Sequence, residues 1–129
     1  MGYRSQVVLA MSQEIRPFFL TFLATRPVAK EMVDGADIFA SSHIEKDDIV
    51  VGWASIKWYS SYDGVAAIID FVEDLDGEDL SKYGDDGNIS WHEEQFKFIR
   101  IGEEQGDIDT RGHGFWDLHP ETRISGISF

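Results

Sequence analysis

The chain has 129 residues and no cysteine, which excludes a disulfide, a thiolate metal site and a cysteine nucleophile. Hydrophobic residues make up 43% of it and aromatic residues 13%, so we expect one folded domain over residues 1–129 rather than a disordered chain. The net charge of −13 is uneven, because residues 1–62 hold seven Asp/Glu against six Lys/Arg whereas residues 63–129 hold seventeen against five.

The first elements form a strand followed by a broken helix. Residues 7–11 are a short apolar run that predicts a buried strand, and Ser12 after it is a candidate helix N-cap. An amphipathic helix is indicated by apolar residues at i, i+3, i+4, i+7 and i+8, namely Ile15, Phe18, Phe19, Phe22 and Leu23. Pro27 predicts a break near Arg26, with a second helical piece through about Val33.

The middle of the chain indicates a hairpin and a second helix. Residues 38–44 and 49–59 are strand-like, and the polar residues 45–48 between them predict an antiparallel hairpin. Strict alternation in the second strand places Trp53 on one face and Ile56 and Trp58 on the other. The spacing of apolar residues then predicts a helix over residues 63–75, capped by Asp63.

The last third predicts an acidic loop and further strands. Residues 76–88 are rich in Gly and Asp without periodicity, residues 96–101 form a strand, and residues 108–116 and 124–129 form weaker ones. The order strand, helix, hairpin, helix, strand is that of a ferredoxin-like α+β two-layer sandwich (βαββαβ), here with one or two additional C-terminal strands.

The acidic residues around the end of the second helix are the main functional candidates. Glu73, Asp74 and Asp76 lie where the helix dipole is negative, at a cost of about 0.3–1 kcal/mol each. Asp70 and Asp74 are four residues apart, so they add a like-charge pair on the exposed face. These acids are either a solvated face that keeps the protein soluble or a surface presented to a basic partner. The predicted partner-binding residues are Asp70, Glu73, Asp74, Asp76, Glu78, Asp79, Asp85 and Asp86, with Trp91 as a hydrophobic anchor.

Motifs for metal binding and catalysis fail on their spacing. An EF-hand loop with Gly77 at its turn would need Val72 as first ligand and Tyr83 as twelfth, and neither side chain can serve. His92 has Phe96 four residues on, where a zinc-protease helix needs a second histidine. We therefore expect no catalytic residue, no cofactor and no metal.

Two alternatives stay open. The first is a small hydrolase or nuclease that depends on a divalent metal held by carboxylates and His113 or His119. The second is an oligomeric accessory or assembly protein that self-associates through a sheet face carrying Trp53 and Trp58. Direct nucleic-acid binding is disfavoured by the absence of a basic, aromatic surface. No apolar run approaches the about 18 residues of a membrane span, and no secretory signal pattern is seen, so we expect a cytoplasmic protein.

Three stretches resemble a group of small acidic proteins encoded by phages and prophages, whose activity is not established. They are Met1-Gly2-Tyr3-Arg4-Ser5, Ile56-Lys57-Trp58-Tyr59, and Phe98-Ile99-Arg100-Ile101-Gly102-Glu103-Glu104 followed by Asp107-Ile108-Asp109. The resemblance implies a phage product in the host cytoplasm, where small acidic proteins are often inhibitors. We therefore expect a monomer or small homo-oligomer that occludes the basic surface of a host defence or nucleic-acid-handling protein, as a DNA mimic does.

Overall fold

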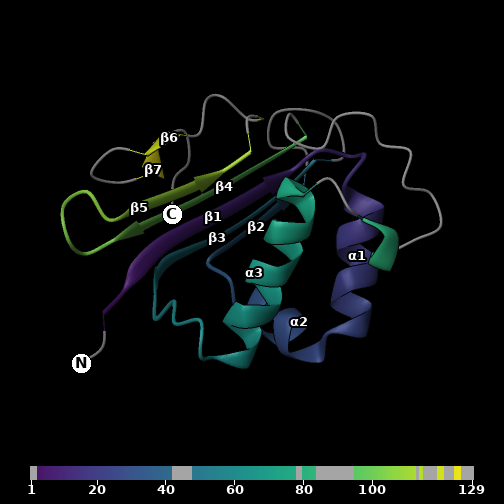
Figure 1. Ribbon diagram of the computed structural model, residues 1–129, viewed down its shortest axis with the longest axis horizontal. Helices are drawn as coiled ribbons and strands as arrows, with labels where there is room; N and C mark the ends of the chain where they lie inside the picture. Colours follow the sequence, from purple (N-terminus) through teal and green to yellow (C-terminus); the bar gives the residue numbers. More distant parts are fainter. Residues whose placement is uncertain are drawn as a thin grey trace.

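The computed structural model describes residues 3–41, 48–77, 80–83, 95–112, 114, 119–120 and 124–125. In chain order the elements are β1 (Ser5–Met11), α1 (Arg16–Thr25), α2 (Pro27–Asp34), β2 (Ile38–Ser41), β3 (Ile49–Ile56), α3 (Asp63–Asp76), the 3-10 turn η1 (Ser81–Tyr83), β4 (Phe96–Gly102), β5 (Ile108–Arg111), β6 (His119–Pro120) and β7 (Ile124–Ser125). The fold class is α+β, as the sequence predicts (Figure 1).

Five strands form one sheet in the order β2-β3-β1-β4-β5, and every neighbouring pair is antiparallel. The central strand β1 pairs with both β3 and β4, so that Val8 lies between Gly52 and Ile99. The predicted hairpin is confirmed by the pairing of β2 with β3, in which Phe39 lies opposite Val51. Because β1 is paired along both edges, its apolar run has the buried position that its composition predicts.

The three helices cover one face of this sheet (Figure 1). Their core is aromatic, since the Phe22 ring of α1 stacks on Phe71 of α3 with centroids 4.7 Å apart and Phe19 lies 5.6 Å from Phe71. The predicted apolar stripe is confirmed, because all five of its residues are buried: Ile15, Phe18, Phe19, Phe22 and Leu23.

The predicted helix break at Pro27 is also confirmed. Helix α1 ends at Thr25 and α2 begins at Pro27, with Arg26 between them in a non-helical conformation. Since proline supplies no backbone N–H, it fits the first position of a helix better than the interior. The break lets α2 turn away from the axis of α1 and lie beside α3 (Figure 1).

Side chains on the second face of the sheet are buried as well. Val8, Val50 and Ile99 point away from the helices, and each is fully buried in a cluster with Ile124 of β7. The backbone N–H of Ile124 donates to Gln6 Oε1 at 2.6 Å. β7 therefore lies against this face and pairs with β6 in a separate two-stranded ribbon (Figure 1). The expected additional C-terminal strands are thus present, but β5 ends at Arg111, before the predicted end of that strand, and residues 126–129 of the last predicted strand lie outside the described part of the chain.

An irregularity in β3 overturns the predicted alternation of its side chains. Ser5 pairs with Ile56 whereas Val7 pairs with Trp53, so β3 carries one extra residue there. Trp53 and Ile56 consequently pack against the same core, together with Trp58. The Trp53 ring is buried and its Nε1 donates to the carbonyl of Met32 at 3.1 Å. Trp53 and Trp58 therefore do not form the exposed sheet face that the oligomeric alternative requires.

The predicted helix caps are wrong. A turn at Ser12–Ile15 precedes α1, and Ser12 contributes its carbonyl, which accepts from the N–H groups of Ile15 and Arg16 at 3.1 Å. The Ser12 hydroxyl is buried and has no hydrogen-bond partner within the described chain. Helix α3 is preceded by Tyr62, and Asp63 lies in its first turn instead of at the cap.

The predicted acidic loop contains a buried piece. Leu80 and Tyr83 are buried, and the Tyr83 ring packs edge-on against Phe22 with centroids 5.8 Å apart. Leu80 and Tyr83 stand singly among acidic residues and show no periodicity. The sequence pattern therefore did not predict that they pack against the helices.

Candidate functional site

Four of the predicted acidic residues lie on the C-terminal half of α3, and each faces a partner from its own chain. Asp70 is the first of them. Its carboxylate is 3.8 Å from the Arg26 guanidinium, and its side chain is 59% exposed. An exposed ion pair of this length contributes about 0–1 kcal/mol, so it holds Asp70 only weakly.

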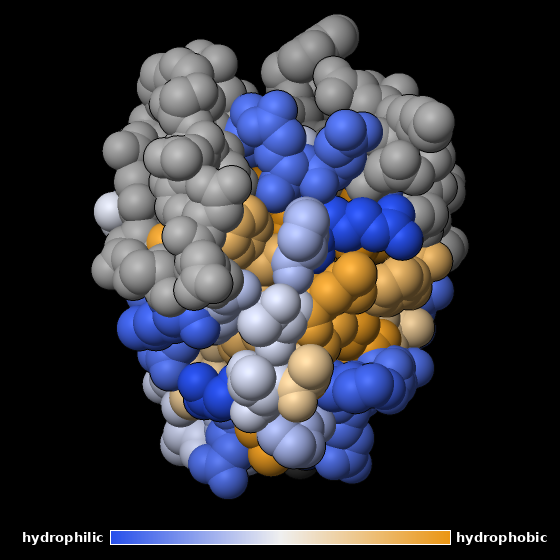
Figure 2. All heavy atoms as spheres, turned by 90° about the vertical axis from the view of Figure 1, so that its right-hand side faces the viewer, coloured by the Kyte–Doolittle hydropathy of each residue, from blue (hydrophilic) through white to orange (hydrophobic). Residues whose placement is uncertain are grey.

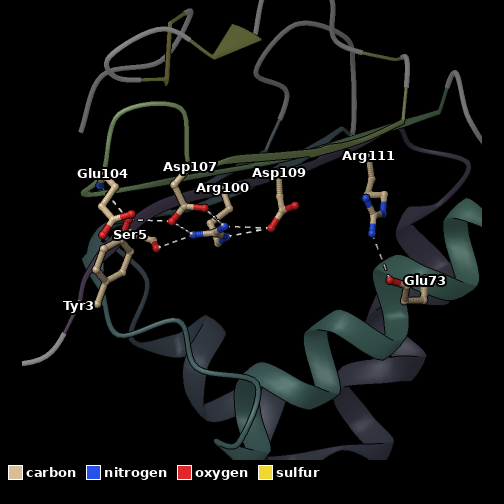
Figure 3. Close-up of polar contacts among 8 residues, drawn as sticks. All are labelled: Tyr3, Ser5, Glu73, Arg100, Glu104, Asp107, Asp109 and Arg111. Atoms are coloured by element: carbon tan, nitrogen blue, oxygen red, sulfur yellow. Dashed lines mark hydrogen bonds and ion pairs between the residues drawn. The ribbon is translucent and has the colours of Figure 1, made fainter.

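Arg111 bridges the edge strand β5 to helix α3. Its guanidinium lies 3.5 Å from Glu73 (Figure 3). It also lies 3.8 Å from Asp76. The Glu73 side chain is 57% exposed and that of Asp76 is 41% exposed. Both carboxylates therefore remain open to solvent although one arginine serves them both.

Asp74 is different, since its side chain is only 16% exposed. It accepts a hydrogen bond of 2.5 Å from the Tyr83 hydroxyl and lies 3.3 Å from Lys82 Nζ. Burial and the neighbouring Asp74 carboxylate raise the pKa of Tyr83. The prediction that Asp74 lies on the exposed face of the helix is wrong, because its side chain is largely buried and accepts the hydrogen bond of Tyr83, which closes the aromatic core.

The remaining predicted residues lie outside the described part of the chain: Glu78, Asp79, Asp85, Asp86 and Trp91. Of the two histidines in the hydrolase alternative, His113 is also outside it and only the backbone of His119 is described. Within the described ranges, no group of three or more His, Cys, Asp or Glu side chains is arranged to hold a metal ion.

A second polar cluster, which the sequence did not predict, lies at the β4–β5 turn (Figure 3). Arg100 on β4 binds Asp107 through two nitrogens, at 2.7 and 3.2 Å, and reaches Asp109 of β5 at 3.0 Å. The hydroxyl of Tyr3 donates to Asp107 Oδ2 at 2.7 Å. Hydrogen bonds from Arg100 and Tyr3 lower the pKa of Asp107 to about 2, and the Asp107 carboxylate in turn raises the pKa of Arg100.

This cluster is a structural contact between strands. Arg100, whose side chain is 15% exposed, pairs with both Asp107 and Asp109, so its single positive charge offsets one of their two negative charges and Asp109 stays 54% exposed. Gly102 leaves room for the contact, because a Cβ there would overlap Asp107 Oδ2 and the Tyr3 hydroxyl. The residues come from the first and third stretches of the resemblance, which therefore meet in space at one structural clamp.

An apolar surface lies on the α1 side of the molecule. Figure 2 shows hydrophobic side chains near the centre of that side, with hydrophilic ones above and below them. Leu20 of α1 is 47% exposed, and no charged residue follows Arg16 within this helix. Exposed apolar side chains alone do not define a partner, whereas the carboxylates of α3 define at least its charge.

No family model matches the chain, and no curated protein and no solved structure is found to be similar to it. In the described part of the chain, no helix is long and apolar enough to cross a membrane.

Proposed function

We propose that the chain is a non-enzymatic binding protein of phage origin, which acts in the host cytoplasm by occluding the basic surface of a host protein. The binding surface consists of Asp70, Glu73 and Asp76 on α3, extended by the acidic residues that follow the helix in sequence. The observation that carries this proposal is the exposure of these three carboxylates together with the length of their ion pairs, 3.5–3.8 Å.

Binding would proceed by exchange of ion pairs. Arg26 and Arg111 are themselves about two-fifths exposed, so each can turn into water when a partner cation replaces it. Because an exposed pair contributes about 0–1 kcal/mol, its loss costs little, and several new pairs formed in a drier interface repay it. Asp74 takes no part, since its carboxylate is committed to Tyr83.

The partner class follows from the sign and density of charge. A protein that grips phosphates presents lysines and arginines along a groove, and a row of carboxylates can occupy the same groove. The net charge of −13 speeds the encounter with such a surface and repels nucleic acid itself and anionic lipid. A nucleic-acid-handling defence protein is therefore the partner that this surface suits best.

We also propose that the α+β architecture is a ferredoxin-like sandwich elaborated at its C-terminus. The order β2-β3-β1-β4, with antiparallel neighbours and helices on one face, supports this assignment. The elaborations are the broken first helix, the added edge strand β5 and the cover that β7 supplies to the second face.

The test is capture of partners from host lysate at increasing salt, with a matched pair of variants. Asp70→Lys/Glu73→Lys reverses two charges of the proposed surface, and Asp34→Lys/Glu104→Lys makes the same charge change elsewhere. The control loses one exposed ion pair, from Asp34 to Lys30 at 2.8 Å, and the first variant loses two, to Arg26 and Arg111, so the variants match in charge change. We expect the first variant to lose the partner that the wild type and the second variant retain. Equal capture by both variants, or capture insensitive to salt, would contradict the proposal.

A further inference from the structure

A groove of about 520 Å³ is lined by residues of α2, the first turn of α3 and the segment that follows β3. This volume is within the range of about 300–1,000 Å³ that is typical of small-molecule sites. The groove lies at the opposite end of α3 from Glu73 and Asp76, so it is separate from the acidic surface.

One wall of the groove is apolar. Val28 of α2 is 39% exposed and Tyr62 is 46% exposed, and both line it together with Met32 and Ile56. Helices α2 and α3 approach closely beneath it, because a Cβ on Gly64 would lie 2.5 Å from Met32 Sδ. An apolar ligand body placed here would remove these exposed side chains from water.

The groove is also lined by two cationic side chains that form no ion pair, although the backbone N–H of Arg4 donates to the Glu103 carboxylate at 2.9 Å. Arg4 and Lys57 line the groove, and neither makes an ion pair with any described residue. Arg4 donates from Nη1 to the carbonyl of Ser55 at 3.1 Å, which leaves other guanidinium N–H groups available.

Most other cations of the described chain lie close to carboxylates. Five of them lie within 4 Å of one, namely Arg26, Lys30, Lys82, Arg100 and Arg111, whereas Lys97 donates to the carbonyl of Gly112. With 24 acidic residues against 11 Lys and Arg in the sequence, two cations left together beside an apolar wall form a site of defined chemistry. Glu31 also lines the groove, from the exposed side of α2, and it disfavours a ligand with a second negative charge.

We propose that this groove binds a small monocarboxylate with an apolar body. The carboxylate lies between Lys57 and Arg4, where charge-assisted hydrogen bonds hold it. The apolar body lies along Val28, Met32 and Tyr62. The first-turn N–H groups of α3, which no side chain caps, add positive potential at the same end.

The test uses octanoate and its neutral counterpart octanol as probes, titrated into the full chain and followed by amide chemical shifts. Octanoate should perturb Val28, Met32, Gly64 and Val65 in a saturable manner. Octanol, which lacks the charge, should bind at least about tenfold more weakly. Shifts that are spread over the molecule without saturation, or equal binding of the two probes, would overturn the proposal.

Variants distinguish the contribution of the Lys57 charge from that of the apolar lining. Lys57→Gln should weaken octanoate about tenfold and leave octanol unchanged, whereas Lys57→Arg should retain octanoate binding. Lys30→Gln is the control. It removes a cation of α2 that pairs with Asp34 and does not line the groove, so it should not change octanoate binding. If Lys57→Gln and Lys30→Gln behave alike, the assignment of the carboxylate to Lys57 is wrong.

Discussion

The hydroxyl of Tyr3 donates a 2.7 Å hydrogen bond to Asp107 Oδ2, across 104 positions of the sequence. The same carboxylate is gripped by Arg100, so one aspartate ties the segment before β1 to the β4–β5 turn (Figure 3). The edge strand β5 carries Arg111, which reaches across to Glu73. The clamp around Asp107 therefore helps to place Arg111, the intramolecular partner of Glu73 on the proposed binding surface.

The clamp predicts a loss of stability in acid. The pKa of Asp107 is lowered to about 2 in the folded protein, against about 3.9 for an unfolded aspartate. A lowered folded pKa stabilises the fold above the unfolded pKa, and this contribution is lost as pH falls through the folded one. Urea unfolding should show Asp107→Asn with a smaller fall in stability than wild type between pH of about 4 and 2.

The NMR chemical shift of the Asp107 carboxyl carbon, followed as pH changes, tests directly what lowers the pKa of this residue. Arg100→Gln should move the pKa of Asp107 back toward the ordinary aspartate value. The hydrogen bond from Arg100 lowers this pKa more than the hydrogen bond from Tyr3 does. A titration curve that Arg100→Gln leaves in place would show that the arginine does not set this pKa.

Gly102→Ala tests the space that the clamp needs. The added methyl group overlaps the contact between Tyr3 and Asp107, and we expect a destabilisation of about 1–3 kcal/mol. Gly35→Ala is the control, since its Cβ would meet nothing nearer than 3.6 Å at a negative φ. Thermal unfolding of both variants measures the difference, and equal melting temperatures would argue against a tight clamp.

Removal of the carboxylate should destabilise the protein much more at Asp74 than at Asp70. Asp74→Ala leaves the buried Tyr83 without its hydrogen bond and should destabilise by about 1–3 kcal/mol, whereas Asp70→Ala should stay within about 0.5 kcal/mol. A double-mutant cycle with Tyr83→Phe isolates the Asp74–Tyr83 term. A coupling energy near zero in this cycle would show that Asp74 does not stabilise the fold through Tyr83.

Local sequence patterns predicted several elements of the fold. The run before Ser12, the stripe from Ile15 to Leu23 and the break at Pro27 follow from burial, helical period and proline chemistry, all of which act over a few residues. The irregularity near Trp53 depends on pairing with β1, which no local pattern encodes.

The candidate site was predictable only in part. Charge density marked the C-terminal half of α3, but every residue there was given the same role. Which acid is exposed and which is structural depends on side chains from the α1–α2 junction, η1 and β5, as the contrast between Asp70 and Asp74 illustrates. Tyr3 and Asp107 are too far apart in sequence for spacing to connect them.

The most direct test of the acidic surface is the association rate of a captured host partner, measured as ionic strength rises. For wild type and Asp34→Lys/Glu104→Lys, we expect association to slow steeply with salt, because long-range attraction drives the encounter. Asp70→Lys/Glu73→Lys should associate at least about tenfold more slowly at low salt and depend less on salt. An association rate that is equal in the two variants at every salt concentration would contradict the account.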